Sequence, residues 1–238
     1  REALLYFLDR AKQYGYEIAF VTNGFSLVDY IPVFKARGYA IRAIQTSLDG
    51  GREDHDSRRT TKNGKPTFDR IAEGIDMALE NGFRVNLRSI LDKRNMSSLW
   101  QLAEFAKNRG WLSYPSLFET TLGRNYELHT CQHTDSLYDR VEMWAEFYEL
   151  AKKHPVLREF HRPQFHGMRY LNENGEMPMP IFDGCPAGKK EWAFDVNGDI
   201  YGCTASVGVA GYKLGSFLNP EEPLDESRVY SWNSRSVL

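Results

Sequence analysis

The sequence has little of the three features that mark membrane, nucleic-acid-binding and disulfide-stabilised proteins. It holds no run of about 18 apolar residues that could span a bilayer, and no signal peptide is visible. Acidic and basic residues nearly cancel, with a formal net charge of -2, so no basic field indicates a nucleic-acid partner. We therefore expect neither a membrane nor a nucleic acid among its partners.

Cysteine is scarce as well, because the 238 residues contain only three. That number does not suit a disulfide scaffold, so metal ligation or simple burial is expected for each thiol. A reducing, cytoplasmic setting follows as the expected localisation. What the chain does have is 42% hydrophobic residues, enough to bury the core of one or two domains.

The first half of the chain alternates between helical and strand-like periodicity. Such an alternation indicates βαβ units around a parallel sheet, and so an α/β fold: part of a (β/α) barrel, or an open doubly wound sheet. A parallel sheet is normally covered on both faces, so a start at a helix predicts that N-terminal elements are missing. The expected elements are helices over 1–14, 25–39, 68–81 and 97–108, strands over 16–24, 40–50, 83–91 and 112–119, and a polar loop over 51–65.

The second half of the chain no longer alternates between helical and strand-like periodicity. Residues 136–153 have the spacing of an amphipathic helix, whose predicted apolar face is Leu137, Val141, Trp144, Tyr148 and Ala151. The residues that follow are proline-rich and have no long period. We therefore predict a partial barrel over 1–154, a connector over 155–184 and a small β-rich module over 185–238.

That module opens with the stretch "CPAGKKEWAFDVNGDIYGC", residues 185–203. Asn197-Gly198 predicts a β-hairpin with a type I′ turn, which would bring Cys203 back to the neighbourhood of Cys185. Gly188 and Gly202 would keep the backbone slim where a bulky group could sit. Two converging thiolates suit a metal or an iron-sulfur cluster, while a buried pair or a disulfide is the alternative.

Histidines and the third cysteine give weaker candidates. Cys131 is flanked by His129 and His133, a set that could bind a metal, although such spacing more often belongs to exposed polar residues. His161 and His166 lie in the predicted connector and could face a barrel mouth. We expect structural roles for these histidines.

Four motifs together resemble the radical S-adenosylmethionine (SAM) enzymes that carry a SPASM domain. The hairpin pattern "D-x-x-G-x-x-Y-x-C" resembles the start of the SPASM domain. "SLDGGREDHDSRR" at 47–59 is similar to the signature after the family's fourth barrel strand, "VTNG" at 21–24 to the end of its third strand, and "NLRSILDKRN" at 86–95 to its fifth strand and the Asn that follows. Their order and intervals agree with the family over nearly the whole chain.

The resemblance implies specific roles. Ser47 would contact the SAM ribose or carboxylate, and Arg59 the SAM carboxylate, with Arg58 as the alternative if the register slips by one residue. Cys185 and Cys203 would be ligands of an auxiliary 4Fe-4S cluster. The family cleaves SAM to a 5′-deoxyadenosyl radical that abstracts hydrogen, commonly from a peptide or protein, with a donor such as flavodoxin or ferredoxin supplying the electron.

The sequence also departs from the family. It lacks the CxxxCxxC loop that binds the SAM-cleaving 4Fe-4S cluster, and the Gly-Gly-Glu stretch of the second strand. Both losses are explained if the chain is truncated at both ends, and such a fragment alone is expected to be inactive. Two alternatives stay open: a non-catalytic degenerate barrel that binds a peptide or partner, and a small zinc-stabilised α/β protein.

Overall fold

The computed structural model describes residues 2–124, 134–162, 171, 174–176, 187–189, 191–209 and 211–234. The chain divides into two compact units, residues 1–164 and residues 165–238, which we call the N-terminal and C-terminal units. None of the described helices combines the length and apolar character that crossing a bilayer requires.

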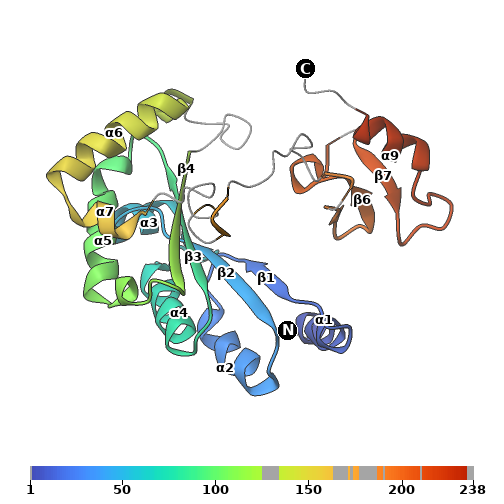
Figure 1. The fold of residues 1–238 in the computed structure, drawn as a ribbon, viewed down its shortest axis with the longest axis horizontal. Helices are drawn as coiled ribbons and strands as arrows, with labels where there is room; N and C mark the ends of the chain where they lie inside the picture. The colour runs from blue at the N-terminus through green and yellow to red at the C-terminus, as the bar shows by residue number, and fades with distance from the viewer. Residues whose placement is uncertain are drawn as a thin grey trace. The chain divides into compact units, whose positions relative to one another are not determined.

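The N-terminal unit is built on a four-stranded parallel sheet (Figure 1). Its strands lie in chain order and every neighbouring pair is parallel, which confirms the predicted α/β class. Parallel strands of this kind end at one common edge, so the segments after their carboxyl ends come together. The strands are β1 (Ile18–Val21), β2 (Ile41–Ser47), β3 (Val85–Leu91) and β4 (Phe118–Arg124).

Helices follow the strands, and α2, α4 and α5 lie along one side of the sheet in Figure 1. Between them and the sheet is the core, where Ile44 and Leu87 of the strands and Ile75 of α4 are fully buried. The elements are α1 (Glu2–Gln13), α2 (Leu27–Arg37), α3 (Arg52–Arg58), α4 (Phe68–Glu80), η1 (Met96–Ser98), α5 (Leu99–Asn108), η2 (Trp111–Ser113), η4 (Thr134–Ser136), α6 (Arg140–Lys153) and α7 (Val156–Phe160).

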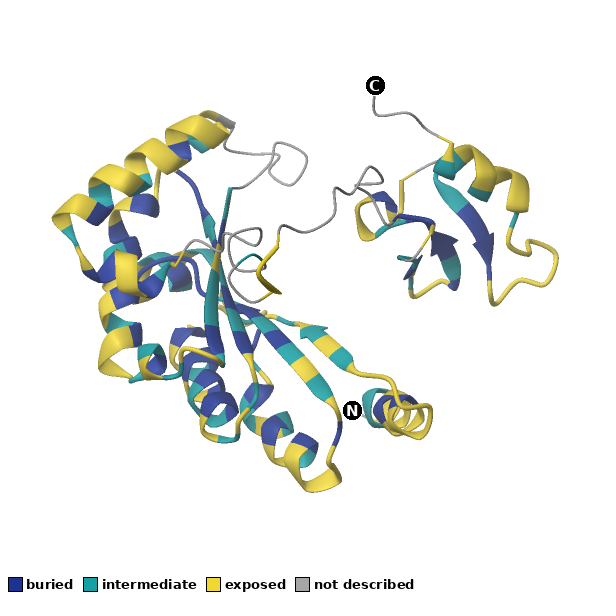
Figure 2. Ribbon diagram, viewed as in Figure 1, coloured by how far each residue is buried: buried dark blue, intermediate teal, exposed yellow. Residues whose placement is uncertain are grey.

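The other face of the sheet is uncovered among the described residues. Burial alternates along β3, with the odd-numbered residues fully buried against the helices and the even-numbered ones half-buried on the opposite face (Figure 2). On that face Val21 is 79% exposed and Thr121 is exposed as well. A one-sided parallel sheet is what part of a (β/α) barrel presents on its inner surface.

Three local predictions for the N-terminal unit were wrong. The expected loop over 51–65 contains α3, a short charged helix without apolar period whose His55 enters the core. The strand expected over 112–119 starts only at Phe118, because residues 111–113 form η2.

The predicted apolar face of α6 was the third error. Val141 is 77% exposed and Tyr148 is 60% exposed, while Met143 and Ala151 are buried. The helix packs mainly on the short elements α7 and η1, which cover only a narrow stripe of its surface. Its start is set by a capping box in which Asp139 accepts from the backbone N–H of Glu142.

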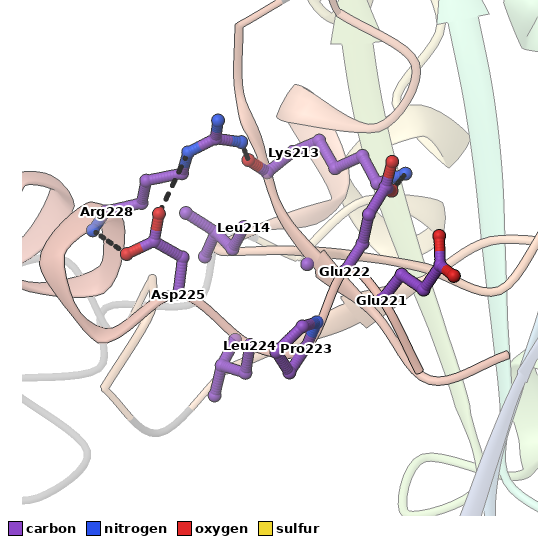
Figure 3. Close-up of a pocket in the computed structure, with 9 residues that line it drawn as sticks. Lys213, Leu214, Glu221, Glu222, Pro223, Leu224, Asp225 and Arg228 are labelled. Carbon is purple, nitrogen blue, oxygen red and sulfur yellow. Dashed lines mark hydrogen bonds and ion pairs between the residues drawn. The ribbon is translucent and has the colours of Figure 1, made fainter. Parts of the chain in front are cut away.

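The C-terminal unit contains a small antiparallel sheet, in the order β5 (Ala193–Phe194), β6 (Asp199–Tyr201), β7 (Lys213–Ser216), with η5 (Thr204–Ser206) and α9 (Glu226–Asn233). A cavity of about 440 Å³ lies between β7 and α9 (Figure 3). Both of its cations are engaged in ion pairs: Lys213 Nζ is 2.8 Å from Asp199 and 2.5 Å from Glu222, and Arg228 pairs with Asp225. This cavity is therefore held by its own ion pairs.

Gly24, three residues after the end of β1, offers a test of how tightly the edge of the sheet is packed. Its φ is 81°, and a Cβ there would overlap Thr46 Oγ1 of β2. We expect Gly24→Ala to lower the free energy of unfolding by about 2–4 kcal/mol, measured by urea denaturation. Gly64→Ala is the matched control, because Gly64 has a φ of 72° but no atom near its Cβ position. A loss no larger at Gly24 than at Gly64 would contradict the packing described.

Candidate binding site at the carboxyl edge of the parallel sheet

The residues after β2 and β3 are tied together through one carboxylate. Asp49 is 2% exposed, and its Oδ1 accepts from the backbone N–H of Ile90 at 2.9 Å. Its Oδ2 lies 2.6 Å from Arg59 Nε. The side-chain amide of Asn95 donates to the carbonyls of Asp49 and Ile90, at 3.2 and 2.9 Å. Asp49 thus joins the ends of two strands to the residue that ends α3.

His55 is fully buried beneath this edge. Its Nδ1 accepts from the backbone N–H of Asp49 at 3.2 Å, which leaves the proton of the neutral ring on Nε2. Nε2 lies 3.1 Å from Thr67 Oγ1, and that hydroxyl donates to the carbonyl of Arg59 at 2.7 Å. Burial lowers the pKa of His55 to about 4, so the ring is neutral near pH 7 and holds the loop in place.

Asp56 of the same motif caps the next helix. Its Oδ1 accepts from the backbone N–H groups of Thr67 and Phe68, at 2.7 and 3.0 Å, where α4 begins. Those N–H groups have no partner within their own helix, so the carboxylate satisfies them and complements the helix dipole. Asp49, His55 and Asp56 of "SLDGGREDHDSRR" therefore hold the loop in place.

The two arginines at the end of α3 differ in their ion-pair partners and in their exposure to solvent. Arg58 Nη1 lies 3.2 Å from Oδ2 of Asp92, which is fully buried and also pairs with Arg94 at 2.8 Å. Burial raises the pKa of Asp92, but donation by Arg94 and the charge of Arg58 outweigh it and leave the pKa below its ordinary value. Nη1 of Arg58 is buried and has no aligned hydrogen bond, so this contact is purely ionic.

Arg59, in contrast, keeps part of its guanidinium for another partner. Its side chain is 37% exposed and uses only Nε in the contact with Asp49. Both arginines line a cavity of about 530 Å³, together with residues after β1 and at the start of α4. The lining residues are Asn23, Phe25, Ser26, Arg58, Arg59, Thr60, Thr61, Lys62, Thr67 and Ile71. Of the two, Arg59 is the more exposed, at 37% against 18% for Arg58.

Ser47 is the last residue of β2 and is half-buried. It alternates with the buried Thr46 and so lies on the uncovered face, in register with Arg88 of β3. It does not line the cavity that holds Arg59, as far as the described residues show. The structure relates the two predicted site residues through Asp49, which follows Ser47 by two positions and binds Arg59.

The hairpin of the C-terminal unit forms, with Ala193 opposite Tyr201. The predicted type I′ turn was wrong, because no described residue other than glycine has positive φ, and only Gly198 of the turn does, at 86°. Asp195 Oδ1 accepts from the backbone N–H groups of Asn197 and Asp199, both at 2.9 Å. In place of the two-residue turn, the chain forms a turn whose backbone N–H groups donate to the Asp195 carboxylate, and Gly198 in this turn adopts the left-handed conformation.

Cys203 follows β6, is half-buried and is a free thiol whose Sγ lies 3.9 Å from Ser206 Oγ. Cys185 lies outside the described residues, and so do Cys131, His129, His133 and His166. No group of three or more His, Cys, Asp or Glu side chains in the described part of the chain could hold a metal ion.

Gly188 and Gly202 do make room for a bulky group, and that group is an indole. A Cβ at Gly202 would lie 2.7 Å from ring atoms of Trp232, and one at Gly188 2.8 Å from the same ring. Asn233 Nδ2 also donates to the carbonyl of Gly188 at 3.2 Å. The helix α9 is thus packed on the hairpin, so the two glycines are explained without a cluster.

His161 has a structural role, as expected. Its Nδ1 lies 2.9 Å from Thr120 Oγ1, and its ring contacts Trp144 and Phe147 with centroids 5.7 Å away. Burial lowers the pKa of His161. The aromatic pair on α6 therefore covers this imidazole.

Sequence reasoning did not single out Asp92, or Arg88, which has no partner in the described part of the chain. Asp92 was part of a quoted motif, but only the fold shows that it follows β3 beside the end of α3. The signal available was its position directly after a buried strand, where parallel sheets place functional side chains.

Fold and site together define an α/β protein with a binding edge at the carboxyl ends of parallel strands. Residues 1–106 match the model of the Radical SAM superfamily. This match covers the part of the chain that holds three of the four motifs on which the resemblance was based.

Curated relatives of several activities are similar to the chain. The AdoMet-dependent heme synthase of Methanosarcina barkeri is 30% identical over 144 residues, covering 60% of this chain and 39% of that protein. The serine-type anaerobic sulfatase-maturating enzyme of Bacteroides thetaiotaomicron is 23% identical over 209 residues, covering 82% of this chain and 49% of that protein. The chain thus spans less than half the length of these relatives.

Among solved structures, native anSMEcpe with bound AdoMet matches with a TM-score of 0.60 at 11% identity. The match covers 89% of this chain and 56% of that one. Such a match shows that the chain shares the α/β fold of that protein, and it is consistent with the parallel sheet being part of a barrel.

The neutral, buried state of His55 gives a pH dependence. The unfolded chain binds a proton on this histidine below pH of about 6.5, whereas the folded one does so only near 4. The free energy of unfolding should therefore fall as the pH is lowered from about 6.5 to about 4, by up to about 3 kcal/mol. His55→Gln should remove this part of the pH dependence, measured by urea denaturation at several pH values.

Ser57→Ala is the control for that experiment, because Ser57 is an exposed residue of the same helix. It should keep the pH dependence of the unmodified protein. An identical slope in His55→Gln would show that His55 is not neutral in the folded state.

Proposed function

We propose that these residues form the core of a radical SAM enzyme of the SPASM type that modifies a peptide or protein. When bound, a reduced 4Fe-4S cluster supplies one electron to the sulfonium of SAM, so that the C5′–S bond breaks to give methionine and a 5′-deoxyadenosyl radical that abstracts hydrogen. Its CxxxCxxC ligands are absent from the 238 residues, and the complete protein would have to supply them.

The observation that carries the proposal is the state of Arg59 within the matched segment. Its guanidinium is held through Nε by the buried Asp49, and its Nη groups remain available at the cavity. A guanidinium fixed in this way binds a carboxylate with little loss of side-chain freedom. Arg59 would therefore hold the SAM carboxylate, and Arg58 would stabilise the loop through Asp92.

Ser47 would contribute a hydroxyl from the uncovered face. As the last residue of β2 it lies at the carboxyl edge, where barrel enzymes bind their ligands. From this position the hydroxyl would form a hydrogen bond to the ribose or carboxylate of SAM. This bond would orient SAM between the carboxyl edge and the uncovered face of the sheet.

For the auxiliary 4Fe-4S cluster, support comes from Cys203 alone. Its thiol is free and half-buried, which suits a ligand, and Cys185 would be the second. The chain fits this group only in part, since the described residues supply a single thiolate. The module over 185–238 would be the beginning of the auxiliary domain, preceded by the connector over 155–184.

A peptide substrate is supported by two similarities. One relative is named as a sulfatase-maturating enzyme, and the solved structure of anSMEcpe with AdoMet and the Kp18Cys peptide matches with a TM-score of 0.57 at 12% identity. The radical chemistry would take its electron from a donor such as flavodoxin or ferredoxin in the cytoplasm.

The test is SAM cleavage by the complete, anaerobically reconstituted protein, followed as 5′-deoxyadenosine. Arg59→Gln should raise the KM for SAM at least tenfold, because a charge-assisted bidentate contact is lost. Lys62→Met is the control, since Lys62 lines the same cavity but is exposed. It should change the KM less than threefold.

A KM unchanged in Arg59→Gln would refute the role of Arg59. If the iron-loaded, unmodified protein forms no 5′-deoxyadenosine, the proposed enzymatic activity is refuted. That result would favour the alternative of a non-catalytic, peptide-binding barrel.

A further inference from the structure

Arg88 is a half-buried cation that has no hydrogen-bond or ion-pair partner among the described residues. It lies in the middle of β3 on the uncovered face, in register with Ser47 of β2 and Thr121 of β4. Its Nε is buried and makes no hydrogen bond, and it forms no ion pair within the described residues. A guanidinium stays charged at all ordinary pH values, so shielding it from water without an acceptor is costly. An arginine in this state is expected where a ligand supplies the missing anion.

The guanidinium is directed toward the carboxyl edge. A Cβ built on Gly123 of β4 would lie 3.7 Å from Arg88 Nη2 and 3.8 Å from its Nε. Gly123 is in register with Ile90, two residues beyond Arg88 along β3. The charged group therefore lies over the bare backbone of β4, one pleat nearer to the carboxyl edge of the sheet than its own Cα.

Asn86 adds an unmatched acceptor on the same face. Its Nδ2 donates to Glu119 Oε1 at 2.9 Å, which fixes the amide orientation, because a carboxylate can only accept. The other amide atom, Oδ1, is buried without a partner. Asn86 lies two residues before Arg88, or about 6–7 Å deeper along the strand. The inner face thus offers a cation and, deeper, an acceptor, both left unsatisfied by the described residues.

We propose that Arg88 and Asn86 bind the substrate, with Arg88 pairing a substrate carboxylate and Asn86 Oδ1 accepting from an N–H or O–H group. This rests on the proposed function, which places substrate against the inner face beside SAM. A carboxylate fits better than a phosphate, since Glu119 one row deeper would repel a doubly charged group. The carboxylate of SAM has its own partner in Arg59 at the edge.

The test is a titration of the 15N-labelled protein, followed through the side-chain Nε–Hε signal of Arg88. Ac-Gly-Glu-Gly-NH2 should shift this signal, while the uncharged Ac-Gly-Gln-Gly-NH2 and SAM should not. Succinate is titrated as a third probe. If the acidic peptide binds more tightly than succinate, the substrate carboxylate belongs to an acidic side chain. If succinate binds more tightly, the substrate is a small free acid. Either result supports a carboxylate site.

Variants complete the experiment. Arg88→Met should weaken binding of the acidic probe at least tenfold, read from the backbone amides of β3, which also report that the variant is folded. Arg42→Met should leave it unchanged, because Arg42 is an exposed arginine of β2. The proposal is overturned if the glutamine peptide shifts the Arg88 signal as strongly as the acidic one. It is also overturned if SAM shifts it and the acids do not, or if no probe shifts it. The titration needs no turnover, so its outcome is separate from that of the SAM-cleavage test.

Discussion

The carboxylate of Asp49 is the contact on which the site depends. It is almost fully excluded from water and accepts from the backbone of β3 while it pairs with Arg59. A buried carboxylate is stable only when its oxygens are satisfied, so the loop from Ser47 to Arg59 must close back on the sheet edge. His55 and Asp56 support the same closure from below, one by receiving the N–H of Asp49 and the other by capping α4.

Some arginines at the carboxyl edge of the sheet are fully engaged in ion pairs, and others have nitrogens left for a ligand. Arg58 and Arg94 neutralise the buried Asp92, and Arg59 neutralises Asp49 with one nitrogen only. On the inner face, Arg88 has no such neighbour within the ranges that the structure describes. We propose two anion positions on this part of the sheet, one at the rim held by Arg59 and one on the inner face held by Arg88.

Much of the fold could be predicted from the sequence, because the four strands and most helices have clear periodicity and glycine boundaries. The helix α3 could not, since "REDHDSR" has no apolar stripe and is held by the tertiary contacts of His55. The prediction of the buried face of α6 was wrong because this helix packs on short elements, which cover little of its surface. At the hairpin, pairing was predictable from Asn197-Gly198, whereas the turn type depended on the carboxylate of Asp195. Ser47 and Arg59 came from a motif, but the bridge between them, Asp49, and the unpaired Arg88 depend on packing across strands.

The account's central claim is that Asp49 orients Arg59 for the SAM carboxylate, and a double-mutant cycle tests it most directly. SAM affinity would be measured at equilibrium on the complete, cluster-loaded protein and on Asp49→Asn, Arg59→Gln and the double variant. Asparagine keeps an acceptor for the N–H of Ile90 but removes the charge. We predict that Asp49→Asn alone loses most of the affinity that Arg59→Gln loses, and that the double variant is no weaker than Arg59→Gln. Losses that simply add would contradict the claim, because they would show that the two residues act on SAM independently.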